Sequence, residues 1–180
     1  MLTLHTKLDP ANLPEPLVVA DELILPLELR EKSRQRATMA SGEEVALFTL
    51  RGTVLRDGDL LRGDDERVVR VRAALEPTCR VECDNARALL RCAFHLGNRH
   101  TQAQVAGLAE HGFLRIRKDA VLKEMLEGLG ARVTEELAPF EPESGAYGGV
   151  HGHGHHDAHH PLAPVPLRQK IHRPSDAAEK

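Results

Sequence analysis

The stretch Asn85-Ala86-Arg87-Ala88-Leu89-Leu90-Arg91-Cys92-Ala93-Phe94-His95-Leu96-Gly97-Asn98-Arg99-His100 decides the fold of the second half of the chain. Its apolar residues recur at spacings of three and four, which predicts an amphipathic helix. Asp84 or Asn85 can supply the N-cap, and Gly97 with Asn98 can take the left-handed conformation that ends a helix. We therefore expect the helix to end at Gly97 and Asn98 and to leave His100 on the turn.

Strand patterns lie on both sides of this helix. Residues 78–82 precede it, and residues 104–108 and 113–117 follow it as two strands. Asp119 can cap a second helix, which Gly128 and Gly130 end, and residues 131–137 form a last strand. The apolar face of the second helix is expected to contain Val121, Leu122, Met125, Leu126 and Leu129. The order strand, helix, strand, strand, helix, strand predicts a ferredoxin-like βαββαβ domain over residues 76–147.

Residues 1–75 carry strand patterns separated by turns. Apolar runs at 17–20 and 23–25 are bounded by prolines, and Ser41-Gly42 predicts a hairpin between residues 34–39 and 43–48. Turns rich in Gly and Asp at 56–59 and 62–65 flank further short strands. These features predict a small all-β domain, either a sandwich or an open barrel, in a chain of the α+β class. The charged run from Arg30 to Arg36 is expected on a solvated face.

The regular patterns stop after Pro139, and residues 148–180 are rich in Gly, His, Pro and charge. So little apolar surface cannot offset the entropy of ordering a chain, which predicts a disordered tail. Six histidines lie within ten residues of it: His151, His153, His155, His156, His159 and His160. His-rich tracts bind metal ions, and neutral imidazole suits nickel, copper and zinc. A purification tag is the alternative, but Gly, Asp and Ala interrupt the cluster and 20 residues follow it.

Charge and hydropathy argue against several functional classes. The 24 basic and 27 acidic residues give a net charge of −3, without the one-signed field that nucleic-acid binding requires. No apolar run approaches ~18 residues and no signal peptide is apparent, so we expect neither a membrane partner nor secretion. Cys79, Cys83 and Cys92 form no CxxC framework, which fits a reducing cytoplasm. Cys79 and Cys83 could contact a metal, but the alternating pattern around them favours ordinary packing.

His100 is the metal-ligand candidate in the folded part. One imidazole cannot hold a borderline divalent ion, which takes four to six ligands. A two-fold dimer axis near His100 would place a second copy beside it, and tail histidines could complete the site. From the residues alone, a loop histidine satisfied by hydrogen bonds is the simpler interpretation.

Several stretches resemble the UreE family of urease accessory proteins, which are nickel metallochaperones. They occur in family order and cover nearly all of residues 15–150. The matching residues are 30–36, 51–59, 95–100 with the sequence His-Leu-Gly-Asn-Arg-His, 114–119 with Val121-Leu122 and Met125-Leu126, 129–130, 139–143 and 145–147.

The resemblance implies a peptide-binding type of β domain over residues 1–75, a metal-binding and dimerising domain over 76–147, and a mobile His-rich tail. It implies that His100 binds the metal at the dimer interface, with Ni2+ as the cargo and Zn2+ or Cu2+ also able to bind. The implied partners are a second copy of the chain, an accessory GTPase and the urease apoprotein. Some family members carry further histidines at positions that are Arg117, Lys118 and Ala120 here, so an auxiliary site is not expected there.

These features predict a cytoplasmic, homodimeric nickel metallochaperone without catalytic residues. The alternative is a nickel or zinc storage or detoxification protein with no obligate acceptor. A metal-dependent hydrolase is disfavoured because no carboxylate stands at HExxH-like spacing to a histidine pair and no nucleophile motif occurs.

Overall fold

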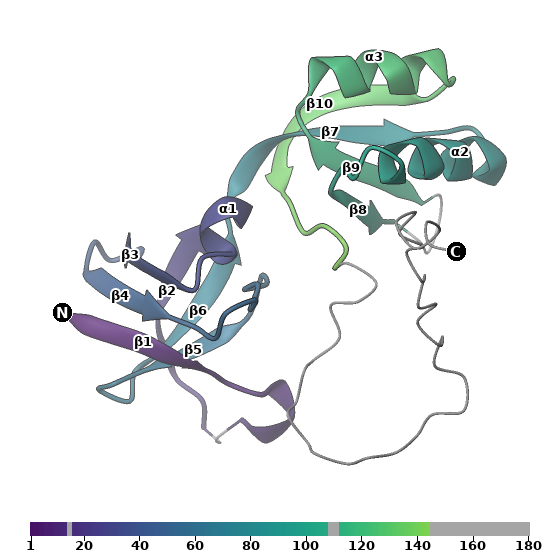
Figure 1. Cartoon of the computed structure of the whole chain (residues 1–180). Helices are drawn as coiled ribbons and strands as arrows, with labels where there is room; N and C mark the ends of the chain where they lie inside the picture. Colours follow the sequence, from purple (N-terminus) through teal and green to yellow (C-terminus); the bar gives the residue numbers. More distant parts are fainter. Residues whose placement is uncertain (14–15, 108–111, 145–180) are drawn as a thin grey trace, which may run out of the picture. The chain divides into compact units, whose positions relative to one another are not determined.

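The computed structural model describes residues 1–13, 16–107 and 112–144. The portion Met1–Gly145 forms one compact unit, which contains a six-stranded sheet followed by a four-stranded sheet with two helices (Figure 1). None of the helices among the described residues is long and apolar enough to cross a bilayer. The chain thus combines two different sheets with a small amount of helix, as the α+β class requires.

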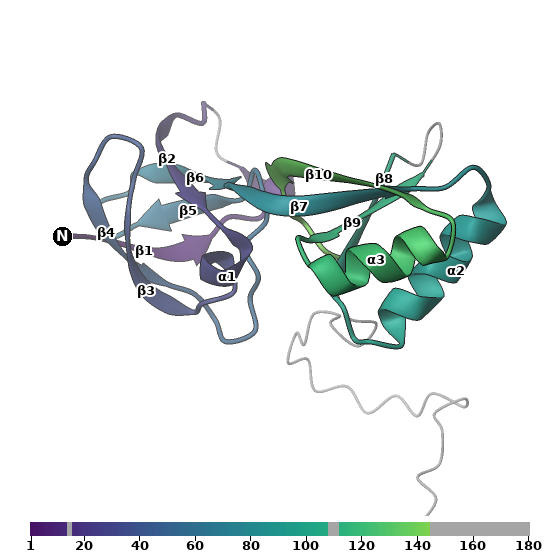
Figure 2. The same cartoon turned by 90° about the horizontal axis from the view of Figure 1, so that it is seen from above.

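The first sheet has the strand order β2-β6-β5-β1-β4-β3 (Figures 1 and 2). Its strands are β1 (Leu2–Lys7), β2 (Val19–Leu25), β3 (Arg34–Thr38), β4 (Glu44–Phe48), β5 (Leu60–Gly63) and β6 (Val68–Ala73). The β3–β4, β5–β6 and β1–β5 pairs are antiparallel, whereas β1–β4 and β2–β6 are parallel. The hairpin expected around Ser41-Gly42 is confirmed, and Gly42 makes its turn with a φ of 92°.

One apolar core serves all of this sheet. Leu4, Leu23, Leu47, Leu61 and Val71 are each fully buried in it, although they come from five different strands. Because the described strands form one sheet, the sandwich of two packed sheets considered from the sequence is wrong. Two short helices, η1 (Pro10–Asn12) and α1 (Leu27–Arg30), interrupt the strands, and the sequence pattern did not predict them.

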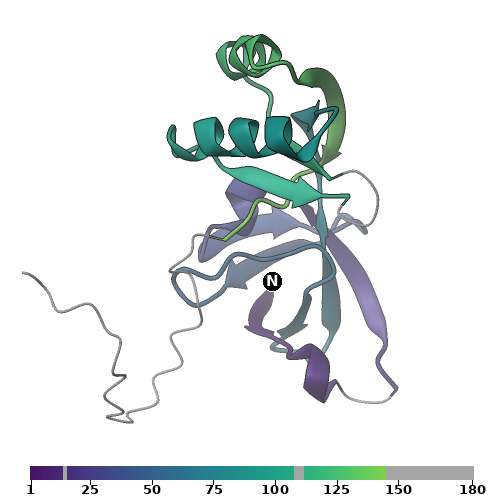
Figure 3. The ribbon, with the colours of Figure 1, turned by 90° about the vertical axis from the view of Figure 1, so that its right-hand side faces the viewer.

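The second sheet has the strand order β10-β7-β9-β8, and all of its pairs are antiparallel. Its elements are β7 (Leu75–Glu82), α2 (Ala86–Gly97), β8 (Ala103–Ala106), β9 (Phe113–Arg117), α3 (Ala120–Gly128) and β10 (Arg132–Pro139). Both helices lie on one face of the sheet (Figure 3). The order of strands and helices along the chain is the one expected from the sequence.

The core between this sheet and its helices forms because alternate strand residues point toward the helices. Cys79 and Val81 of β7 and Ile116 of β9 pack there against Leu96 and Leu126 of the two helices. Cys79 is therefore a packing residue, as its strand pattern predicted.

The N-caps of the two helices follow the predictions. Asn85 accepts a hydrogen bond from the Ala88 amide, and Asp119 accepts one from the Leu122 amide. Val121 was expected on the apolar face of α3, but its side chain is 76% exposed. It lies one residue outside the row formed by Leu122, Met125, Leu126 and Leu129, which pack on the core.

Residues 140–144, called the strap below, follow β10 and contact residues of the first sheet. Phe140 is fully buried, and its carbonyl accepts a hydrogen bond of 2.6 Å from Arg30 Nη2. Arg30 is also fully buried, so the expectation that it lies on a solvated face is wrong. Its guanidinium donates to the carbonyls of Leu25 and Leu55 as well, and it pairs with the Glu141 carboxylate. These partners explain how the sheet accommodates a buried cation.

Candidate metal centre

The turn that carries His100 is a Schellman motif at the end of α2. The His100 amide donates to the Gly97 carbonyl at 2.9 Å, and the Thr101 amide donates to the Leu96 carbonyl at 3.1 Å. His100 itself takes the left-handed conformation, with a φ of 52°. Asn98 has a φ of −62°, and Gly97 remains the last helical residue. The expectation that Gly97 and Asn98 adopt the left-handed turn is therefore wrong, because the helical bonds continue past them.

A left-handed non-glycine residue is strained, because its Cβ approaches the backbone more closely than in the right-handed region. Histidine is among the residues that tolerate this conformation best, yet glycine would cost less. Such strain is found where function requires a particular side chain. The imidazole at this position is thus better explained by its chemistry than by the needs of the turn.

The imidazole lines a hollow of about 450 Å³ at the end of α2. Leu96 and Gly97 contribute from the helix, Val105 from the neighbouring strand β8, and Glu143 from the strap. His100 is exposed, so its ring nitrogens are accessible to a ligand. An accessible imidazole beside a carboxylate is an arrangement that can bind a borderline divalent cation.

Apolar side chains remain uncovered on α2 and β8, two of the elements that contribute to this hollow. Leu90 and Phe94 lie four residues apart on one face of α2 and are 69% and 64% exposed. Val105, which lines the hollow, is 41% exposed. Large exposed apolar groups that gather near a candidate site are typical of an interaction surface.

Among the residues that the structure describes, no three His, Cys, Asp or Glu side chains form a group that could hold a metal ion. His100 thus lacks a complete ligand set within the described part of a single chain. The other predicted ligands are His151, His153, His155, His156, His159 and His160, and all of them lie outside the described residues.

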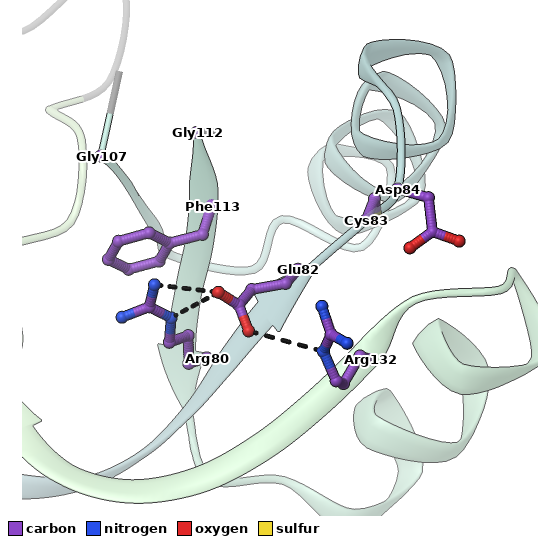
Figure 4. A pocket seen from close by; sticks show the side chains of 8 residues that line it. All are labelled: Arg80, Glu82, Cys83, Asp84, Gly107, Gly112, Phe113 and Arg132. Atoms are coloured by element: carbon purple, nitrogen blue, oxygen red, sulfur yellow. Dashed lines mark hydrogen bonds and ion pairs between the residues drawn. The ribbon is translucent and has the colours of Figure 1, made fainter. Parts of the chain in front are cut away.

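A second hollow is lined by residues of β7, β9 and β10, among them Glu82, Phe113 and Arg132 (Figure 4). Three of its four charged side chains are paired, since Glu82 contacts Arg80 at 2.9 Å and Arg132 at 3.7 Å, and the fourth is Asp84. The Arg80 guanidinium also lies 3.9 Å from the centre of the Phe113 ring. Because both arginines already pair with Glu82, only Asp84 is left to bind a ligand, and this hollow is a weaker ligand site than the one at His100.

Cys83 lines the same second hollow, and its sulfur lies 3.8 Å from that of Cys92. Both cysteines are free thiols in the structure. Burial raises the pKa of the Cys83 thiol to about 11, and the neighbouring Cys92 adds to this shift. The Cys83 thiol is therefore protonated at neutral pH, and its sulfur is a poor ligand in that state.

Comparison with known proteins identifies the family. The family description "UreE urease accessory protein, N-terminal domain" matches residues 4–74, and its C-terminal counterpart matches residues 76–172. The chain belongs to the UreE family of urease accessory proteins. The resemblance inferred from the sequence stretches is thereby confirmed.

Individual relatives match over most or all of their length. A protein of Janthinobacterium sp. (strain Marseille), named "Urease accessory protein UreE", is 70% identical over 99% of this chain and 100% of its own length. One from Nitrosospira multiformis with the same name is 60% identical, with 98% of each chain covered. A third, from Cupriavidus necator, is 50% identical over 76% of this chain and 69% of its own.

The structure places the three positions at which no auxiliary site was expected in and around β9 and α3. Arg117 is the last residue of β9, Lys118 forms an ion pair with Glu135, and Ala120 begins α3.

The sequence did not predict that the strap contributes to the site. Only the contacts of residues 140–144 with Arg30, Arg56 and Ala103 reveal that Glu143 belongs to the hollow of His100.

Proposed function

We propose that the chain is a nickel metallochaperone that binds Ni2+ through His100 and delivers it for assembly of the urease active site. The observation that carries the proposal is the exposed imidazole of His100, which stands in a strained left-handed turn where glycine would be more favourable. Membership of the UreE family supports urease as the destination. In this proposal the chain is a carrier without catalytic residues, and Ni2+ is its cargo.

A homodimer would supply the second imidazole. The uncovered side chains of Leu90 and Phe94 on α2 and of Val105 in the hollow of His100 support a two-fold interface on these elements. A two-fold axis near His100 would bring both copies of this residue to one ion. We further interpret the second sheet, with its βαββαβ order, as the ferredoxin-like dimerising domain expected over residues 76–147.

The histidines of residues 151–160 would complete the ligand set and capture further ions. From Glu143 to His151 there are eight residues, which can span at most about 27 Å when extended. In this proposal the tail imidazoles supply the ligands that His100 lacks among the described residues of one chain. Such ligands would exchange quickly, which suits an ion that must be handed on.

The partners in this proposal are the accessory GTPase and, through it, the urease apoprotein. We place the exchange in the cytoplasm, where a reducing environment would keep Cys79, Cys83 and Cys92 as the free thiols seen in the structure. The competing function is storage of nickel or zinc with no acceptor. It shares the metal sites but predicts no transfer.

Activation of urease at limiting nickel separates the two functions. The wild-type chain should raise the activity of urease apoprotein mixed with its accessory GTPase, whereas His100→Ala should raise it much less. His5→Ala, which changes an exposed histidine of β1, is the matched control and should behave as wild type. If the wild-type chain withholds nickel from urease, storage is the function.

Truncation tests the role of the tail. A chain that lacks residues 150–180 should bind fewer Ni2+ ions per dimer, as measured by calorimetry, and should remain a dimer in light scattering. Loss of the dimer on truncation would mean that the tail has a structural role instead.

A further inference from the structure

The strap is held against the rest of the chain by two arginines of the first sheet region. Arg30 binds the Phe140 carbonyl and the Glu141 carboxylate. Arg56 donates from Nη1 to the Pro142 carbonyl at 2.9 Å and from Nη2 to Ser144 Oγ at 3.0 Å. The residues on both sides of Glu143 are therefore held by charge-assisted hydrogen bonds, one to the Pro142 backbone and one to the Ser144 side chain, and such bonds are stronger than neutral ones.

The strap also pairs with the open edge of the second sheet. Strand β8 is the last strand of that sheet, so one of its edges is free to accept hydrogen bonds. The Glu143 amide donates to the Ala103 carbonyl at 2.9 Å, and the Glu141 amide donates to Gln104 Oε1 at 3.1 Å. Ala103 lies three residues after His100, so these bonds fix Glu143 beside the turn that carries the imidazole.

Glu143 and His100 share the hollow at the end of α2. Its lining is otherwise uncharged, since Leu96, Thr101 and Val105 are typical of the remaining residues. Among the described residues, the carboxylate of Glu143 forms no ion pair and accepts no hydrogen bond, unlike that of Glu141 in the same strap. A carboxylate left unpaired beside an accessible imidazole is free to bind a cation.

We propose that Glu143 is a second metal-binding residue of the His100 site, contributed by each chain, and that Arg56 positions it through the strap. This inference rests on the proposed function. A carboxylate oxygen and an imidazole nitrogen together suit borderline divalent ions such as Ni2+ and Zn2+. The negative charge of Glu143 also favours a dication over a neutral ligand.

Calorimetric titration of the full-length chain with Ni2+ alone tests the assignment. Glu143→Gln should weaken the His100-dependent binding step about tenfold or more, with the tail-dependent steps unchanged. Glu44→Gln, which changes an exposed carboxylate of β4, is the matched control. Wild-type affinity in Glu143→Gln would overturn the proposal.

The positioning role of Arg56 is tested by combining variants. Arg56→Ala should weaken the same step, but it should add nothing in a chain that already carries Glu143→Gln, because Arg56 acts through that carboxylate. Arg62→Ala, which removes a pairing with Glu66, is the control. If Arg56→Ala lowers the Ni2+ affinity equally in the wild-type chain and in the Glu143→Gln chain, its effect is a general structural one. That result would overturn the positioning role.

His100→Ala separates this inference from the proposed function. If His100→Ala and wild type bind Ni2+ equally well, the proposed metal site itself fails. If His100→Ala loses the tight step and Glu143→Gln keeps it, the site stands and only the role of Glu143 is refuted.

Discussion

His100 occupies at the end of α2 the backbone position that Gly130 occupies at the end of α3. In α3 the Gly130 amide donates to the Glu127 carbonyl at 2.9 Å and the Ala131 amide to the Leu126 carbonyl at 3.0 Å. The two bonds of His100 and Thr101 at the end of α2 have the same spacing along the chain. Both helices therefore end in a Schellman motif, with φ values of 52° at His100 and 91° at Gly130.

Glycine at position 100 should separate the strain of the turn from the function of the imidazole. His100→Gly is expected to raise the free energy of unfolding by up to ~1 kcal/mol, because glycine takes the left-handed conformation without strain. His100→Ala keeps the strained Cβ and should not gain this stability. Both variants should lose the high-affinity Ni2+-binding step that depends on the His100 imidazole. Urea denaturation and calorimetry measure the two effects, and a His100→Gly chain less stable than His100→Ala would contradict the explanation.

Gly130→Ala should show the cost of the left-handed position directly. We expect the free energy of unfolding to fall by about 1–2 kcal/mol, although an added Cβ would meet no atom within 4 Å. Gly128→Ala is the matched control, since Gly128 lies within α3 and a Cβ there is equally unhindered. This change should stabilise the chain by about 0.5–1 kcal/mol in thermal unfolding. Equal effects of the two substitutions would rule out the conformational explanation.

Replacement of the buried Arg30 should be strongly destabilising. Arg30→Met would remove the guanidinium that donates to the Glu141 carboxylate and to three backbone carbonyls, at a cost of about 3–5 kcal/mol. Arg30→Lys retains the charge but cannot reach all of these acceptors, so an intermediate loss is expected. Arg36→Met, at an exposed position of β3, should change the stability by less than ~0.5 kcal/mol. Urea denaturation measures all three, and a small effect of Arg30→Met would show that water replaces the guanidinium.

The raised pKa of Cys83 predicts slow alkylation near neutral pH. With a pKa of about 11, only about one thiol in a thousand is ionised at pH 8, and the thiolate is the reactive form. The rate with iodoacetamide should therefore rise about tenfold per pH unit up to pH 10. Cys92→Ala removes the neighbouring thiol and should lower the pKa of Cys83, which shifts this profile to lower pH. A profile centred near pH 8.5 in the wild-type chain would contradict the predicted shift.

Acid should weaken the first sheet through Glu43 and Asp65. Hydrogen bonds from Arg67 lower the pKa of both carboxyl groups below the ordinary values of 4.5 and 3.8. A carboxyl group with a lowered pKa in the folded state stabilises the fold above its ordinary pKa, and this contribution is lost as the pH falls through the lowered value. NMR titration should find both midpoints below the ordinary values, and Arg67→Gln should move them upward. Unchanged midpoints in that variant would assign the shifts to another cause.

The elements of the second sheet could be predicted because each one carries its own local signal. Asn85 and Asp119 are residue types that favour N-caps, so they predict where the two helices begin. The spacing of the apolar residues, which include Leu96 and Leu126, predicts which helix faces are buried. Strand β1 was not predicted, and the residues with which it pairs lie more than forty positions away in the chain. The polar and apolar pattern of a few neighbouring residues carries no information about strand pairing over such a distance.

The site was predictable only in part for the same reason. His100 could be proposed from its turn and from the resemblance to the UreE family, but Glu143 could not, because its place in the hollow depends on distant contacts. The burial of Arg30 was hidden within a charged run whose other members, Arg34 and Arg36, are exposed. The high density of charge in this run led to the expectation that Arg30 is exposed to solvent. In the fold, buried backbone carbonyls accept its hydrogen bonds instead.

The central place of β1 in its sheet has a consequence for the newly made protein. Strand β1 is the first of its six strands to be synthesised, yet it lies between β4 and β5, which end at Phe48 and Gly63. At ~5–20 residues per second, translation takes several seconds to supply both neighbours. During that interval Leu2 and Leu4, which are buried in the folded chain, remain available to chaperones, and both edges of β1 lack their partner strands.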